Sequence, residues 1–159
     1  MTRRNGESRQ RAKRGFSLLE LLVVMAVLAI LMAALVPLAS ERLRLARIRT
    51  AVNQLTLDLR AARWTAVAGR STVDLTVAVD PENRYEYTDV RGRVRAVTLP
   101  EGVRIVSSTT PIRFNPNGSV AGGSSTVIEM PLTAGVGSRW TVSTNVLGVS
   151  TTTSEQVDL

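Results

Sequence analysis

A nearly continuous apolar segment, Phe16–Ala39, constrains this chain more than any other feature. Its polar residues are Ser17 and Glu20, both close to its start. At 1.5 Å per residue a helix of this length spans about 36 Å, which exceeds the roughly 30 Å hydrocarbon core of a bilayer. The sequence therefore predicts a membrane-crossing helix over residues 16–39.

Residues 1–15 form a basic head that ends in Gly15. The head carries six basic groups and one acid, so it supplies most of the net charge of +7. Because flanking basic residues stay on the cytoplasmic side, we expect the rest of the chain to lie across the membrane. The high isoelectric point belongs mainly to this head and does not by itself predict nucleic-acid binding.

Three fates of the apolar segment are open: an ordinary cleaved signal peptide, an uncleaved anchor, or cleavage between Gly15 and Phe16. A secretory signal has an apolar run of about 7–15 residues and then small residues, whereas this run is longer and Pro37 stands at the small-residue position. Cleavage after Gly15 would retain the helix and create an α-amine on Phe16. That amine would lie four residues before Glu20, on the same helix face, where an acid also suits the helix dipole.

The stretch RGFSLLELLVVMAVLAIL closely resembles the class III signal of type IV pilins and type II secretion pseudopilins. The resemblance implies that a prepilin peptidase cuts after Gly15 and N-methylates Phe16. It also implies that Glu20 guides the registration of subunits in a filament. Pro37 matches the helix-breaking proline common in this family, where the helix can loosen within the filament.

A second helical pattern predicts an amphipathic helix over residues 40–68 that packs on a sheet. Its apolar residues recur at alternating spacings of three and four: Leu45, Ile48, Val52, Leu55, Leu59, Ala62 and Ala66. Leu57, Ala61 and Trp64 are expected to widen the stripe. Gly69 then supplies a stop signal.

Residues 70–159 are rich in Val, Thr, Ser and Gly and predict a small antiparallel β domain. The expected strands are 73–79, 84–90, 93–99, 103–107, 111–114, 126–132 and 140–146, separated by turn sequences such as DPENR and NPNG. Together with the helices this predicts an α+β, pilin-like lollipop. Its long N-terminal helix has one half in the membrane and one half on the sheet.

The carboxy-terminal half resembles the GspH/FimT-type minor pilins and pseudopilins. The resemblance rests on three segments: Ile112–Gly118, Val127–Leu132 and Trp140–Gly148. The last motif of that group usually has Gly-Arg, whereas this chain has Gly148-Val149.

The sequence contains no histidine and no cysteine, which removes the commonest general base and metal ligands. No nucleophile–base pair, phosphate loop or metal cluster is visible, so the sequence predicts a non-enzymatic chain without a cofactor. Asp80, Glu82, Glu86 and Asp89 lack the spacing of a calcium loop and are better explained as turn and strand surface.

Arg91, Arg93 and Arg95 form a basic cluster that could hold DNA phosphates. The competing interpretation is a charged edge strand that discourages unwanted strand pairing. No aromatic residues alternate with these arginines to stack on bases, and residues 151–159 form an acidic tail.

The preferred hypothesis is a minor pilin or pseudopilin, a structural subunit of a type IV pilus or type II secretion pseudopilus. Its expected partners are other pilin or pseudopilin subunits, prepilin peptidase, an inner-membrane assembly platform and, before assembly, membrane lipid. The expected location is the inner membrane, with the C-terminal domain periplasmic or extracellular, and then the filament. The alternatives are a DNA-binding minor pilin for DNA uptake and a single-pass anchored domain that never assembles.

Overall fold

The computed structural model describes residues 17–132 and 135–158, without the side chains of residues 34–39. The predicted processing pair, Gly15 and Phe16, and the side chain of Pro37 therefore lie outside the described residues. The chain divides into two units, residues 1–38 and 39–159.

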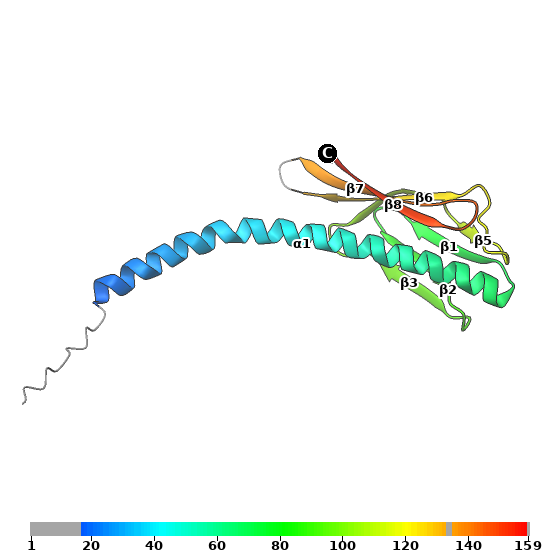
Figure 1. Cartoon of the computed structure of the whole chain (residues 1–159), viewed down its shortest axis with the longest axis horizontal. Helices are drawn as coiled ribbons and strands as arrows, with labels where there is room; N and C mark the ends of the chain where they lie inside the picture. The colour runs from blue at the N-terminus through cyan, green and yellow to red at the C-terminus, as the bar shows by residue number, and fades with distance from the viewer. Residues whose placement is uncertain (1–16, 133–134, 159) are drawn as a thin grey trace, which may run out of the picture. The chain divides into compact units, whose positions relative to one another are not determined.

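The helix α1 (Leu18–Gly69) is assigned without interruption through position 37 (Figure 1). A proline removes one backbone donor from a helix and still leaves the neighbouring turns bonded. The two helical patterns of the sequence are therefore one continuous backbone element.

The carboxyl end of α1 differs from the expected glycine stop. The left-handed residue is Arg70, with φ of 47°, and not Gly69. The Ser71 amide donates to the Ala66 carbonyl and the Arg70 amide donates to the Val67 carbonyl, which is the hydrogen-bond pattern of a Schellman cap. An arginine thus occupies the position that glycine fills at the lowest conformational cost.

The second unit contains strands in two antiparallel sheets. The strands are β1 (Val73–Ala78), β2 (Arg84–Thr88), β3 (Val94–Thr98), β4 (Arg104–Ser108), β5 (Ile112–Phe114), β6 (Ser124–Pro131), β7 (Val136–Thr144) and β8 (Ser150–Asp158). One sheet has the order β3-β2-β1-β5 and the other β4-β6-β7-β8. The α+β class is confirmed, and the single sheet expected from the sequence is resolved into two.

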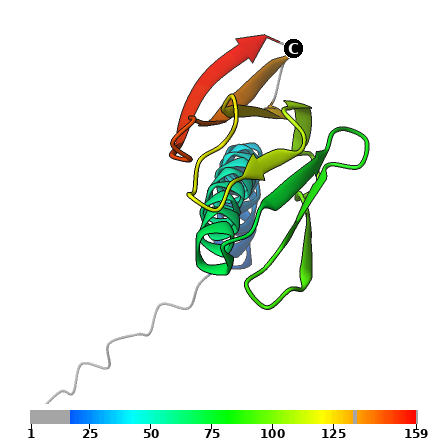
Figure 2. The same ribbon diagram turned by 90° about the vertical axis from the view of Figure 1, so that its right-hand side faces the viewer.

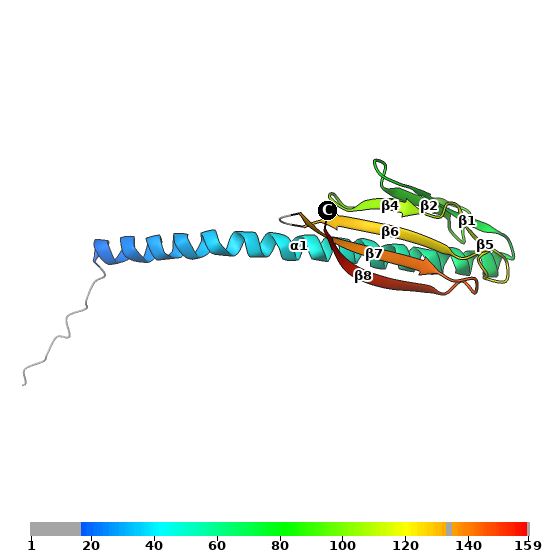
Figure 3. The same ribbon diagram turned by 90° about the horizontal axis from the view of Figure 1, so that it is seen from above.

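The two sheets lie on different sides of the second half of α1, as the view along the helix shows (Figure 2). The strands β4, β6, β7 and β8 run side by side over it (Figure 3). Hydrogen bonds connect the two sheets: the turn between β1 and β2 is bonded to β4, because the Asp80 amide donates to the Ile105 carbonyl and the Ile105 amide donates to Asn83 Oδ1. One helix therefore supplies the core of both sheets.

The strand β8 lies in the segment that the sequence analysis treated as an acidic tail. It pairs along its whole length with β7, from Thr144 opposite Ser150 to Val136 opposite Asp158. The alternation of apolar and polar residues that marks a half-buried strand is missing here, because polar side chains occupy both faces. That absence explains why the pattern did not predict a strand.

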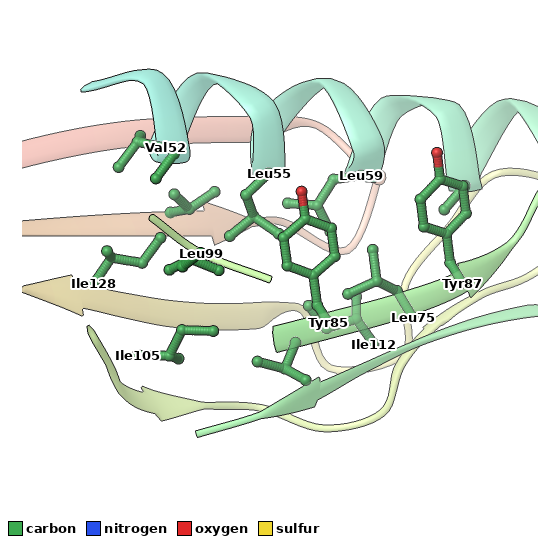
Figure 4. Packing of buried hydrophobic residues seen from close by; sticks show 14 of the residues in the cluster. Val52, Leu55, Leu59, Leu75, Tyr85, Tyr87, Leu99, Ile105, Ile112 and Ile128 are labelled. Carbon is green, nitrogen blue, oxygen red and sulfur yellow. The ribbon is translucent and has the colours of Figure 1, made fainter. Parts of the chain in front are cut away.

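The helical stripe predicted from the sequence forms the core. Its members from Ile48 to Ala66 are buried, Leu45 is half-buried, and Ala51 joins them. Val52, Leu55 and Leu59 belong to one buried cluster that also contains residues of both sheets, such as Leu75 and Ile128 (Figure 4). The predicted widening of the stripe is wrong: Ala61 is exposed, Leu57 is 57% exposed and Trp64 is 66% exposed, because they project from the opposite side of the helix.

Candidate functional site

The amino terminus of α1 carries a side-chain cap. Ser17 precedes the helix, its Oγ accepts a hydrogen bond from the Glu20 amide at 3.2 Å, and its carbonyl accepts one from the Leu21 amide. Serine followed three residues later by glutamate is the sequence of a capping box. This signal is present in the sequence as S-L-L-E and was not among the predicted features.

Glu20 lies in the first helical turn and its side chain is exposed. A carboxylate there interacts favourably with the positive end of the helix dipole. Its proposed partner, the amine of a cleaved Phe16, lies outside the described residues. The structure therefore gives Glu20 a position at the helix start that suits both a local cap and an intermolecular contact.

On both sides of Glu20, the first part of the helix exposes apolar side chains all round. The exposed residues are Leu18, Leu19, Leu21, Leu22, Val23, Val24, Met25, Val27, Leu28, Ile30, Leu31 and Met32. A helix that is apolar all round is stable only when lipid or protein covers it. Among the described residues, no helix combines the length and the apolar character needed to span a bilayer.

The arginine cluster surrounds the turn between β2 and β3. Asp89 Oδ1 accepts the backbone amides of Arg93 at 3.0 Å and Arg91 at 2.8 Å, and its Oδ2 pairs with the Arg93 guanidinium at 3.1 Å. These contacts, led by the Arg93 amide, lower the pKa of the Asp89 carboxyl. Part of the positive charge is therefore balanced within the turn itself.

Arg95 lies in β3 directly opposite Tyr87 of β2. Its positive charge partly counteracts the rise in the pKa of the Tyr87 hydroxyl. The strand β3 forms one edge of its sheet, so the charged-edge interpretation agrees with the topology. DNA contact by Arg91, Arg93 and Arg95 stays a prediction.

A buried carboxylate that the sequence analysis overlooked links α1 to β2. Asp58 is 3% exposed and accepts hydrogen bonds from Tyr85 Oη at 2.6 Å, Tyr87 Oη at 2.9 Å and Gln54 Nε2 at 3.0 Å. Both tyrosine hydroxyls point toward α1 in Figure 4. Burial, followed by the bond to Asp58, raises the pKa of Tyr85 and of Tyr87. Two features of the sequence could have indicated this site: an acid, Asp58, beside the apolar stripe of the helix, and two tyrosines on one face of a strand.

A second link joins α1 to two turns of the same form. Asn115–Ser119 and Asn145–Val149 each close through a glycine amide that donates to the asparagine carbonyl. Arg63 Nε donates to the Gly118 carbonyl at 3.0 Å, and a Cβ on Gly148 would lie 2.1 Å from that carbonyl oxygen. Gly148 has φ of 74°, so this position of the family motif requires glycine for both space and conformation.

Two family models match the chain. The prokaryotic N-terminal methylation motif matches residues 10–36, and type II transport protein GspH matches residues 51–148, which is more than half of the chain. Neither the comparison with curated proteins nor that with solved structures returns a match. The chain belongs to the GspH family, and its amino terminus carries the methylation motif of type IV pilins and pseudopilins.

Proposed function

We propose that this chain is a minor pilin or pseudopilin, processed after Gly15 and assembled into a filament through its amino-terminal helix. The observation that carries the proposal is a capped helix start that bears one carboxylate, followed by a surface that is apolar on every side. The methylation motif spans the same residues. The chain acts as a structural subunit and a substrate of the peptidase.

Cleavage after Gly15 would leave Phe16 immediately before the cap residue Ser17. The new α-amine would then lie near the first turn, where Glu20 can neutralise it in its own chain or in a neighbour. Apolar faces of neighbouring helices would replace lipid around Leu22 and Leu28 when the subunit leaves the membrane. Before assembly, the segment 16–39 anchors the chain in the inner membrane.

Two variants separate the charge of Glu20 from its capping position. Glu20→Gln replaces the carboxylate in the first turn by a neutral amide of similar shape and so removes the negative charge. Ser17→Ala removes the side-chain cap and keeps the charge of Glu20. In cells that contain a prepilin peptidase and partner subunits, we expect Glu20→Gln to be processed and to lose assembly. The Ser17→Ala variant should be processed and should retain most of its assembly into filaments.

The measurements are the mass of the amino-terminal peptide and the fraction of the chain in sheared filaments. A mature chain that begins with methylated Phe16 supports the proposal. Normal assembly of Glu20→Gln would contradict the registration role. Filament-free wild-type protein that keeps Met1 would instead support the single-pass anchored domain.

The DNA-uptake alternative is tested by retardation of DNA at several salt concentrations. Replacement of Arg91, Arg93 and Arg95 by alanine would weaken binding and reduce its salt dependence if these residues contact phosphates. Because Asp89 already pairs with Arg93, we expect little difference between the variant and the wild type.

A further inference from the structure

Four exposed arginines near the start of the second unit are not neutralised by neighbouring acids. We call them the arginine belt: Arg42, Arg44, Arg47 and Arg49. Between residues 40 and 57 the helix α1 carries one acid, Glu41, so four positive charges stand against one negative charge. Within the described part of the chain, no member of the belt forms an ion pair. The belt therefore presents uncompensated positive charge.

The belt surrounds the helix and does not form a single stripe. Because residues advance by about 100° around a helix axis, Arg49 returns to the side of Arg42, and Arg47 returns to the side of Arg44. The two pairs lie on nearly opposite sides, since Arg44 is turned by about 200° from Arg42. Ile48 is buried in the core next to them. One flat protein surface could not contact both pairs, whereas lipid around the helix could.

The belt begins close to the end of the predicted membrane segment 16–39. At 1.5 Å per residue, Arg42 lies about 4.5 Å beyond Ala39 along the helix axis, and Arg49 lies about 15 Å beyond it. The headgroup layer extends about 5–8 Å outside the hydrocarbon core on each side of a bilayer. Helical side chains tilt toward the amino terminus, so the long arginine side chains lean back toward this layer. The belt is therefore placed at the height of lipid phosphates.

The charge of the belt also opposes the expected orientation of the chain. Basic residues beside a membrane segment favour the cytoplasmic side, where the leader 1–15 is expected, but the belt follows the segment on the far side. Guanidinium groups bind phosphates through paired, charge-assisted hydrogen bonds. Phosphates that neutralise the belt on the far side would remove this conflict.

We propose that the arginine belt binds the phosphodiester groups of anionic phospholipids in the leaflet next to the β domain. The inference rests on the proposed function for the membrane position of residues 16–39. Anionic headgroups are selected over zwitterionic ones because their negative charge is not balanced within the headgroup. The contact holds the unassembled subunit at a fixed depth, and the subunit must exchange it for other partners when it enters a filament.

Two triple variants that remove the same charge test the belt. The belt variant leaves Arg44 in place, because this residue donates to the Pro131 carbonyl at 3.5 Å. It combines Arg42→Gln, Arg47→Gln and Arg49→Gln. The control variant changes three exposed arginines that also lack ion pairs among the described residues: Arg60→Gln, Arg91→Gln and Arg104→Gln. Both variants keep the leader, so its basic residues contribute equally to each.

The measurement is the lipid that the full chain retains. Each protein is reconstituted into vesicles of equal parts phosphatidylglycerol and phosphatidylcholine and is then purified in mild detergent, and mass spectrometry counts both lipids per chain. We expect the belt variant to retain about threefold less phosphatidylglycerol than the wild type or the control variant, with phosphatidylcholine unchanged. Equal thermal midpoints verify that both variants are folded.

A second measurement tests the depth of the belt. The chain has no cysteine, so a fluorescent label can be attached to Ala46→Cys or to Ala61→Cys, both at exposed positions of α1. These residues lie about 10 Å and about 33 Å beyond Ala39 along the helix axis. In vesicles whose lipids carry a quencher on the headgroup, the label at position 46 should be strongly quenched and the label at position 61 should not.

Equal retention of phosphatidylglycerol by the two triple variants would overturn the proposal. So would its displacement by dilute inorganic phosphate, since the belt would then be a site for free phosphate. A belt variant that keeps its lipid and loses assembly in cells would show that the arginines bind an acidic surface of another subunit. If the label at position 46 is quenched, such results refute the lipid contact alone. An unquenched label at position 46 would refute the membrane position, and with it the proposed function.

Discussion

The two parts of α1 contain similar apolar residues but use them differently. Leu22 and Leu28 in the first unit are exposed, whereas Leu55 and Leu59 in the second unit are buried against both sheets. Polar residues interrupt only the second part regularly, so it has one apolar stripe and a solvated face. The second part therefore packs against partners within the chain, whereas the first part requires partners outside it.

The largest expected effect compares Leu59→Ala with Leu28→Ala. Truncating a buried leucine removes apolar contacts and leaves a cavity, so Leu59→Ala should lower the free energy of unfolding of the β domain by about 3 kcal/mol. Leu28→Ala should change it by less than about 0.5 kcal/mol. Denaturant unfolding of the full chain in micelles, followed by near-ultraviolet circular dichroism, measures both. Equal losses would remove the distinction between the two parts.

Gly148→Ala tests how tightly the second part of α1 holds its turns. The new Cβ would collide with the Gly118 carbonyl and with Arg63, and the residue would keep a left-handed φ. We expect a loss of about 2–3 kcal/mol in the free energy of unfolding. The control is Gly92→Ala, which has φ of 73° but nothing within 4 Å, and it should cost about 1 kcal/mol. Similar losses would show that the close contact has no energetic role.

High pH should weaken the second unit through its buried tyrosines. Folding raises the pKa of Tyr85 and Tyr87 above the ordinary value of 10.0, so their contribution is complete below pH 10. Above pH 10 the unfolded chain ionises first, and each protected tyrosine should reduce stability by up to about 1.4 kcal/mol per pH unit. Unfolding measured between pH 8 and pH 11.5 (roughly the range that titrates free tyrosine) tests this. A double Tyr85→Phe, Tyr87→Phe variant should show a flatter decline above pH 10, and an identical decline would contradict the assignment.

The smallest expected effect is a gain. Arg70→Gly places glycine at the left-handed residue of the Schellman cap and should stabilise the second unit by about 0.5–1 kcal/mol. Thermal unfolding of the full chain measures the shift, with Arg60→Gly in the helix interior as the control that should destabilise by about 1 kcal/mol. Destabilisation by Arg70→Gly would mean that the arginine side chain stabilises the cap more than its backbone strains it.

The sequence predicted the features that depend on periodicity. The 3.6-residue stripe identified the core face of α1 because one side of the helix packs inside the chain. The α+β class followed from this stripe together with the strand and turn patterns of residues 70–159. Outward residues such as Trp64 were misassigned because apolar character alone does not give direction. The role of Glu20 stays a prediction, since its proposed partner at Phe16 lies outside the described residues.

Features that depend on pairing between distant segments could not be predicted from the local periodicity of apolar residues. The division into two sheets depends on which strands pair with one another. The strand β8 lacks the alternation of apolar and polar residues from which a strand is predicted. The buried site at Asp58 needed the tyrosines of a strand far along the chain to be brought against the helix. Hydrogen-bond partners of this kind are specified by the folded topology and not by local spacing.

The carboxylate of Asp58 also favours one pairing register of β2, because it accepts hydrogen bonds from both of its tyrosines. A slip of one residue would turn both tyrosines outward and present Glu86 to the helix in their place. Two carboxylates would then face each other in a site from which water is largely excluded, and that arrangement is strongly disfavoured. A single acid on the helix thus destabilises the shifted register of β2 as well as stabilising the native one.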